Sequence, residues 1–150
     1  MPQSLSKVIL HIVFSTKNRE PWLDSNLRPR LHAYLATICR DLGSDFVRVG
    51  GVADHVHIVA TLSRIVSQAQ LVEQIKKLSS KWTKIVDVRY RGFCWQRGYG
   101  IFSVSPSQLD TVLEYVDKQH EHHRTRTFQE EYRDLLRKHG MDFDERYVWD

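Results

Sequence analysis

Alternation of hydrophobic and polar residues predicts a β-strand near the start of the chain. Between Lys7 and Ser15, one face carries Val8, Leu10, Ile12 and Phe14, and the other face carries His11 and Val13. The next segment has helical spacing instead, with apolar residues at Leu27, Leu31, Tyr34, Leu35 and Ile38. Gly43 follows as a helix stop. The first two elements are therefore a strand and a helix.

The middle of the chain repeats this alternation of element types. Phe46, Val47 and Val49 predict a second strand, Gly50-Gly51 a turn, and His55 to Leu62 a third strand, which together form a hairpin. A helix is expected from Val66 to about Lys81, followed by a loop from Arg89 to Gly100. Ile101 to Val104 is the last predicted strand.

Two further helices complete the pattern. Ser105 and Pro106 are suited to the N-cap and first turn of a helix that runs to about His123. A shorter helix is expected from Thr127 to Lys138. The order of the first six elements is β-α-β-β-α-β, which predicts an α+β, ferredoxin-like (RRM-like) domain over residues 1–150. We expect an antiparallel sheet with helices on one face, a second face free for a site, and an added C-terminal helix.

Composition narrows the setting without fixing the function. The hydrophobic content of 41% is typical of a globular protein, and charged residues interrupt every apolar run before it could span a membrane. The N-terminus has no signal-peptide pattern, and the two cysteines form no C-x-x-C. These features predict a cytoplasmic protein. A formal net charge of +4 is compatible with a phosphate-bearing partner.

The motif His55-Val56-His57 is the strongest chemical signal in the sequence. Residues two apart on a strand share a face, so both imidazoles can reach the same ion, while Val56 faces a core. Neutral imidazole is a common metal ligand. Two strand histidines that only satisfy local hydrogen bonds are the alternative. Two ligands do not close a metal site, so the chain must supply others.

The helix after Pro106 offers a second signal. Leu109, Val112, Leu113 and Val116 define its core face, whereas Tyr115 and Gln119 are neighbours on one flank. A phenol is a weak nucleophile at neutral pH, but it can attack a phosphodiester that a divalent ion polarises. The spacing alone favours a different interpretation, a boundary tyrosine with a hydrogen-bonded hydroxyl beside a solvated glutamine.

Several segments together resemble one family over essentially the whole chain. His55-Val56-His57 followed by Tyr115 and Gln119 resembles the single-tyrosine HUH (His-hydrophobic-His) transposases, IS200-like, of the smallest bacterial insertion sequences. The segments that also resemble the family, in family order, are Thr16-Lys17-Asn18-Arg19, Trp95 to Ser105, His122-His123 and Asp144 to Trp149. Asn18 departs from the family, which often has an aromatic residue there.

The resemblance implies a catalytic role for each motif residue. Tyr115 is the expected nucleophile, and His55, His57 and Gln119 are the expected ligands of Mg²⁺ or Mn²⁺. The implied reaction is cleavage and rejoining of single-stranded DNA through a 5′-phosphotyrosine, with no nucleotide cofactor. The implied partners are single-stranded DNA with subterminal hairpins and a second copy of the chain. The resemblance favours a homodimer in which His55 and His57 of one chain meet Tyr115 of the other. It also implies a bacterial or archaeal protein associated with the nucleoid.

Other polar residues have two interpretations each. The candidate DNA contacts are Lys17, Arg19, Lys76, Lys77, Lys81 and Arg97, although a charged helix face is often only solvated. His11 is expected beside the two motif histidines, either in the site or in a structural hydrogen bond. His122 and His123 either approach the same ion or cap the end of their helix.

Two other functions are compatible with the same fold. One is a domesticated or related HUH nuclease that acts on chromosomal hairpin repeats. The other is a ferredoxin-like module that binds single-stranded nucleic acid without cleaving it. The second lacks support, because histidines stand where an RNA-recognition motif would have stacking aromatics.

Overall fold

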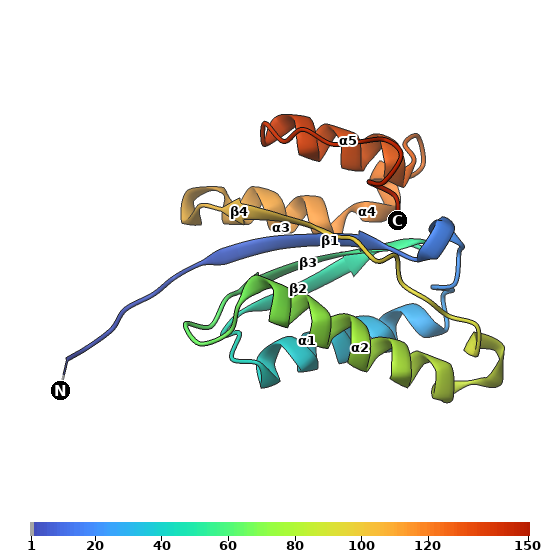
Figure 1. Ribbon diagram of the computed structural model, residues 1–150, viewed down its shortest axis with the longest axis horizontal. Coiled ribbons are helices and arrows are strands. Elements are labelled where there is room, and N and C mark those ends of the chain that lie inside the picture. The colour runs from blue at the N-terminus through green and yellow to red at the C-terminus, as the bar shows by residue number, and fades with distance from the viewer. Residues whose placement is uncertain (1) are drawn as a thin grey trace.

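The computed structural model describes residues 2–150 and confirms the ferredoxin-like topology. Four antiparallel strands, β1 (Ile9–Ser15), β2 (Val47–Gly51), β3 (His55–Thr61) and β4 (Gly100–Val104), form one sheet in the order β2-β3-β1-β4. Helices α1 (Leu27–Asp41) and α2 (Gln68–Val86) cover one face of it (Figure 1). The central strands β1 and β3 are therefore buried between layers.

The main core lies between the sheet and helices α1 and α2. The alternation along the central strands places Leu10, Ile12 and Phe14 of β1 in this core, together with Val56, Ile58 and Ala60 of β3. Burial of large aliphatic side chains such as these is the dominant stabilising contribution to folding. The sequence predicted which residues of these two strands share a face, and the structure confirms that prediction.

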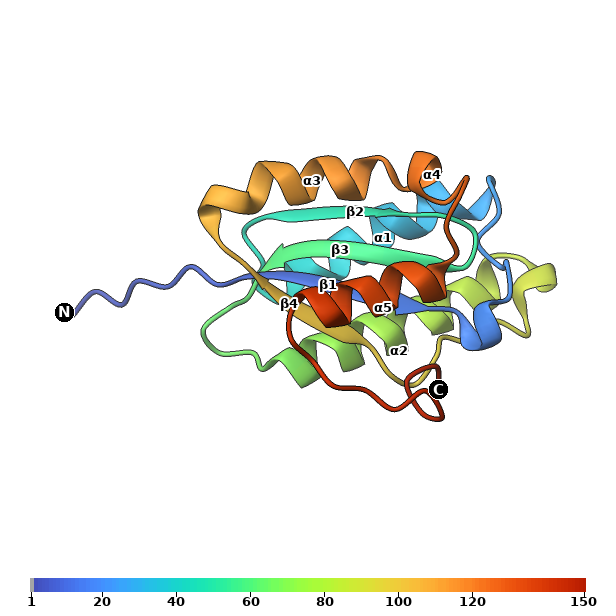
Figure 2. The ribbon, with the colours of Figure 1, turned by 90° about the horizontal axis from the view of Figure 1, so that it is seen from above.

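The second face of the sheet is covered, contrary to the expectation that it would be free. Helices α3 (Leu109–Asp117), α4 (Gln119–His122) and α5 (Phe128–Lys138) form a further layer on that side (Figures 1 and 2). Val116 of α3 packs against Ile9 and Val59, and Phe128 of α5 packs near Val13. Apolar residues also lie on this face among the polar side chains, and the additional helices pack against them. Any site here is interior.

Several element boundaries differ from the predicted ones. A 3₁₀ turn, Pro106–Gln108, precedes α3, and the Ser105 side chain makes no cap hydrogen bond. The single helix expected up to His123 is interrupted at Lys118, which separates α3 from α4. Helix α2 begins at Gln68, where Ser67 and Gln70 form a capping box, and it continues to Val86.

The glycine pair predicted as a turn belongs to a strand. Gly50 and Gly51 end β2 and pair with His57 and Val56, so the turn lies over residues 52–54. The reason is packing: a Cβ on Gly50 would lie 2.3 Å from the Val116 carbonyl oxygen of α3. Gly50 therefore lets α3 approach the sheet closely.

The aromatic C-terminal segment packs against the rest of the domain. Phe143, Val148 and Trp149 contact the apolar cluster of Phe102 and Tyr132 under α5. The Asp150 carbonyl oxygen accepts a hydrogen bond of 2.7 Å from the Gly98 amide, which fixes the tail beside the segment that leads into β4. No helix within residues 2–150 combines the length and apolarity that a bilayer span requires.

The tight contact at Gly50 gives a stability prediction. Gly50→Ala should lower the free energy of unfolding by about 1–3 kcal/mol, because the added methyl displaces α3 from β2. Gly92→Ala is the matched control, since a Cβ there would meet only the edge of the Trp22 ring at 3.3 Å. Denaturant unfolding of both variants measures the difference. Equal stabilities would show that α3 is not held at this contact.

Candidate functional site

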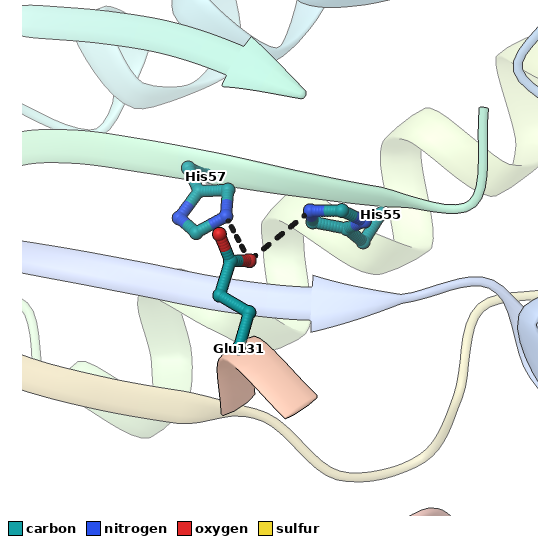
Figure 3. Close-up of side chains that lie close together, drawn as sticks. All are labelled: His55, His57 and Glu131. Atoms are coloured by element: carbon teal, nitrogen blue, oxygen red, sulfur yellow. Dashed lines mark hydrogen bonds and ion pairs between the residues drawn. The ribbon is translucent and has the colours of Figure 1, made fainter. Parts of the chain in front are cut away.

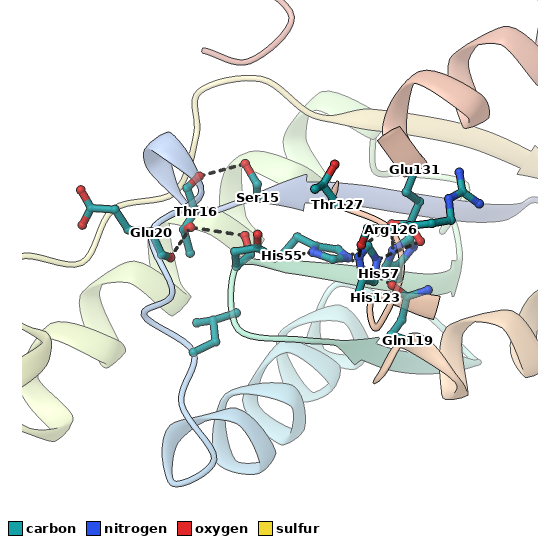
Figure 4. A network of polar contacts seen from close by, with 12 residues as sticks. Ser15, Thr16, Glu20, His55, His57, Gln119, His123, Arg126, Thr127 and Glu131 are labelled. Carbon is teal, nitrogen blue, oxygen red and sulfur yellow. Dashed lines mark hydrogen bonds and ion pairs between the residues drawn. The ribbon is translucent and has the colours of Figure 1, made fainter. Parts of the chain in front are cut away.

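The two motif histidines are fixed by the start of β3. The Thr16 amide donates to the Asp54 carbonyl oxygen at 2.8 Å, and the Thr16 hydroxyl donates to the Glu20 carbonyl oxygen at 2.7 Å (Figure 4). These bonds tie the residue before His55 to the turn after β1. His55 and His57 then point into the interior between sheet and helices, and both side chains are fully buried.

Glu131 of α5 meets both imidazoles. Its Oε1 atom lies 2.9 Å from His57 Nε2 and 3.3 Å from His55 Nε2 (Figure 3). The potential ligand atoms of the three residues all lie within 4.8 Å of one another. A buried carboxylate normally has a partner of opposite charge or several hydrogen bonds. Here the histidines provide them, so the helix layer and the sheet are joined by a polar cluster.

The predicted nucleophile and the predicted amide ligand adjoin this cluster. Gln119 Oε1 lies 3.1 Å from His55 Nε2. The Tyr115 hydroxyl donates a hydrogen bond to Glu131 Oε2. Although α3 and α4 are separate helices, Gln119 Nε2 still donates to the Tyr115 carbonyl oxygen at 3.2 Å. One chain therefore brings together all four residues that the sequence singled out: Tyr115, His55, His57 and Gln119.

Two residues orient the histidine rings through contacts to their Nδ1 atoms. Asp54 Oδ1 lies 2.7 Å from His55 Nδ1, and His11 Nε2 lies 2.8 Å from His57 Nδ1. Each contact occupies the Nδ1 atom and leaves Nε2 directed at Glu131. Metal-binding histidines in proteins are typically held in this way, through the nitrogen that does not bind the ion. His11 therefore makes a structural hydrogen bond beside the site, which is one of the two roles that the sequence allowed.

The two histidines after Gln119 also lie close to the cluster. His123 Nε2 is 3.1 Å from Glu131 Oε2, within ion-pair distance but without the geometry of a hydrogen bond. Its ring centroid is 4.4 Å from that of His55. The His122 ring lies 4.6 Å from the Tyr115 ring. His123 is consequently part of the polar interior, beyond any role at the helix end.

Burial and ion pairing shift the pKa values of the groups in the cluster in different directions. Burial alone would raise the pKa of Glu131, but contacts with His123, His55 and His57 outweigh it and hold that pKa well below its ordinary value. Burial likewise opposes the charged form of His55, yet Asp54 and Glu131 raise its pKa to about 9. Burial lowers the pKa of His57 and, with His57 adjacent, brings the pKa of His11 to about 3. One imidazolium therefore faces one carboxylate.

The same surroundings affect the tyrosine. Burial, reinforced by the negative charge of Glu131, raises the pKa of Tyr115 well above its ordinary value. Its hydroxyl stays protonated at neutral pH in this arrangement. Chemistry at this oxygen would need a group that takes its proton, and the carboxylate that accepts its hydrogen bond is the nearest such group.

The donor set fits a divalent cation. Two imidazoles, a carboxylate oxygen and an amide oxygen converge, and His123 adds a buried Nε2 atom with no hydrogen-bond partner among residues 2–150. Imidazole suits first-row transition ions, and carboxylate and amide oxygens suit Mg²⁺ and Mn²⁺. An ion there would replace the proton on His55 Nε2.

Sequence reasoning missed Glu131. A signal for it was present, since Phe128, Glu131, Tyr132, Leu135 and Leu136 occupy helical positions i, i+3, i+4, i+7 and i+8. A charged residue in the middle of an apolar stripe has to find a buried partner. In the structure Glu131 is 2% exposed. Which buried partner it meets depends on where α5 packs, and that cannot be read from the helix itself.

The predicted DNA contacts fall into two groups. Lys17, Lys77, Lys81 and Arg97 are exposed. Lys76 instead donates to the carbonyl oxygens of residues 96–98 at 2.6–3.0 Å, and Arg19 lies 5.8 Å from the centre of the Trp149 ring. The structure thus gives Lys76 and Arg19 intramolecular contacts. Helix α2, which carries the three lysines, covers the face of the sheet opposite the histidines (Figure 1).

Comparison with known proteins supports the same family over most of the chain. No curated protein sequence matches it significantly. Among solved structures, a candidate transposase from Deinococcus radiodurans r1 is similar with a TM-score of 0.60 and 20% identity, over 79% of this chain and 98% of that one. A REP-associated tyrosine transposase bound to a REP hairpin has a TM-score of 0.56 and 14% identity, over 77% of this chain and 68% of that one. Both likenesses concern the fold. The sequence profile described as "Transposase IS200 like" matches residues 4–119, and the chain belongs to this family.

Proposed function

We propose that this transposase cleaves and rejoins single-stranded DNA through a covalent 5′-phosphotyrosine at Tyr115, assisted by a divalent metal ion. The observation that carries the proposal is the convergence of Tyr115, Gln119, His55, His57 and Glu131 at one buried cluster. The family supports a DNA-processing enzyme. A binding module without chemistry would have no need for such a cluster.

His55, His57 and Glu131 would hold the ion, with Gln119 as a further ligand. A divalent ion at this position would withdraw charge from the non-bridging oxygens of the scissile phosphate and fix its alignment. The two oxygens of Glu131 face different partners, because Oε1 meets the imidazoles and Oε2 accepts the Tyr115 hydroxyl. The carboxylate can therefore position the nucleophile while it contributes to the ligand set.

The bond changes follow from this arrangement. The Tyr115 oxygen forms a bond to phosphorus as its proton passes to Glu131 Oε2, and the bond from phosphorus to the 3′-oxygen breaks. The leaving 3′-oxygen takes a proton from solvent water and becomes a hydroxyl. In the reverse sense, a 3′-hydroxyl attacks the phosphotyrosine and releases Tyr115. Because the phosphodiester energy is retained in the covalent bond, strand joining needs no nucleotide cofactor.

DNA with a hairpin is the proposed partner. The solved transposase bound to a REP hairpin has this fold, and the surplus positive charge of +4 suits a phosphate backbone. A related nuclease that acts on chromosomal hairpin repeats would use the same cluster in the same way. The two roles differ in the DNA that is cleaved rather than in the chemistry of Tyr115.

The arrangement of subunits is a separate question. The resemblance favours a dimer in which each site combines histidines of one chain with Tyr115 of the other. In this structure, however, Tyr115 and Gln119 contact Glu131 and His55 of the same chain. The same-chain contacts favour sites that each belong to one protomer, whether or not the protein is a dimer.

Loss of the nucleophile should abolish the covalent product. Tyr115→Phe removes only the attacking oxygen, so we expect no protein–DNA adduct and nearly unchanged binding of hairpin DNA. Labelled single-stranded hairpin DNA, incubated with protein and Mn²⁺ and run on a denaturing gel, measures the adduct. Tyr99→Phe is the matched control, because Tyr99 is exposed on the loop before β4. An adduct with Tyr115→Phe would assign the nucleophile to another tyrosine.

The metal cluster gives a prediction that needs no DNA. Mn²⁺ at a hundred times its Kd should stabilise the protein by about 2.7 kcal/mol, because the folded chain binds the ion. Glu131→Gln and His57→Ala should remove most of this gain, whereas Gln119→Ala should reduce it partly, since water can replace an amide ligand. Thermal unfolding with Mn²⁺ and with chelator measures it. Gln129→Ala, on α5 but outside the cluster, should keep the full gain. Equal stabilisation of all the variants would refute this ligand set.

Mixing two inactive variants distinguishes the subunit arrangements. His57→Ala and Tyr115→Phe proteins are combined under conditions that allow subunit exchange, and adduct formation is measured. If each site is built from one chain, every site in the mixture lacks either His57 or the Tyr115 hydroxyl, so we expect the mixture to stay inactive. Recovery of cleavage would instead show that protomers exchange Tyr115, and the same-chain arrangement would then be wrong for the active protein.

A further inference from the structure

A cleft of about 570 Å³ is lined in part by Tyr115. Its walls come from α3 and α5, which run above the sheet in Figure 2, and its floor comes from β1 and β4. Tyr115 and Glu131 line this cleft, but His55 and His57 do not. Tyr115 is thus accessible from a cavity that reaches the metal-binding cluster only through Glu131.

The floor and walls of the cleft are largely apolar and aromatic. The Phe102 and His139 rings stack with centroids 4.5 Å apart and planes inclined at 27°. Val104, Val112 and Leu135 add aliphatic surface beside them. Phe102 is only 3% exposed, whereas His139 is exposed, so the His139 ring is the aromatic surface on which an unpaired base can stack.

The rim of the cleft carries polar groups of two kinds. Gln108 and Thr111 on the α3 side supply an amide and a hydroxyl, which can hydrogen-bond the edge of a base. Lys138 at the end of α5 is exposed and forms no salt bridge within residues 2–150. It is an available cation for a phosphate. By contrast, Arg126 and Asp134 pair with each other across the rim.

The size of the cleft limits the ligand. A volume of about 570 Å³ falls within the range of pockets that enclose one small organic molecule. It suits a single nucleotide, and it is too small for a duplex. Since Tyr115 lines the cleft, a nucleotide bound here would adjoin the phosphate under attack.

We propose that the cleft between α3 and α5 binds one unpaired nucleotide next to the scissile phosphate, with its base against the exposed ring of His139. The inference rests on the proposed function and adds a specific substrate contact to it. The nucleotide would hold the strand in register with Tyr115. This selects single-stranded DNA at the cleavage point, because a paired base cannot enter the cleft.

Binding of mononucleotides tests the proposal without any cleavage. The four deoxynucleoside 3′,5′-bisphosphates are titrated into the full chain in the presence of chelator, and backbone amide shifts are followed by NMR. We expect shifts at Ser103, Thr111 and Lys138, which all line the cleft. Deoxyribose 3,5-bisphosphate, which lacks a base, should bind at least about tenfold more weakly, because it cannot stack. Shifts confined to other surfaces, or equal binding of the base-free probe, would overturn the proposal.

Two substitutions make the test specific. Thr111→Trp fills the cleft from an exposed position on α3 and should weaken nucleotide binding at least about tenfold. Asp110→Trp, the neighbouring exposed position outside the lining, should bind as the parent does. Lys138→Glu provides a second variant if Thr111→Trp fails to fold, and it should also weaken binding. Unchanged affinity in the folded cleft variants would contradict the assignment.

The outcome is separable from that of the proposed function. Nucleotide binding in the cleft without adduct formation would leave the cleft assignment standing and refute Tyr115 as a nucleophile. Adduct formation by the parent protein, combined with normal adduct formation by Thr111→Trp, would confirm the chemistry and refute the cleft. The adduct assay with Thr111→Trp therefore completes the experiment.

Discussion

The pairing of one buried carboxylate with buried imidazoles is the interaction on which this structure depends. Glu131 reaches the sheet from α5 and is 2% exposed, and its Oε1 atom lies within 3.3 Å of two histidine nitrogens on β3. A charge in such a position is tolerated only when it is paired and hydrogen-bonded. The cluster therefore sets where α5 lies, and through the Tyr115 hydroxyl it also fixes the flank of α3.

This dependence explains how an ordinary fold acquires a chemical site. One face of the sheet forms an aliphatic core with α1 and α2, whereas the other carries polar residues that need polar partners from its covering helices. Tyr115 contacts Glu131, which joins the histidines, and it also lines the cleft between α3 and α5. A phosphate beside Tyr115 would have the ion on one side and its own nucleotide on the other. Rigid helices and strands hold each part, as accurate positioning of a nucleophile requires.

Much of this could be predicted from the sequence because it is local. The period of two in β1 and β3 determined which side chains enter the main core, and it placed His55 and His57 on one face. The i, i+4 spacing likewise made Tyr115 and Gln119 neighbours on one flank of a helical segment. Family segments spread along the chain indicated how these pairs belong together. Their roles in catalysis remain predictions, because geometry alone does not test them.

What only the tertiary structure decided are the contacts between elements far apart in sequence. Glu131 is 74 residues from His57, and nothing in the pattern of α5 tells which surface its carboxylate meets. Contacts between distant elements also explain three other differences from the sequence prediction. These are the covered second face, the position of Gly50 within a strand, and the hydrogen bonds from Lys76 to the carbonyl oxygens of residues 96–98. Periodicity reports the faces of one element at a time, whereas buried charges and close backbone approaches are satisfied between elements. Their partners are determined when the layers pack together.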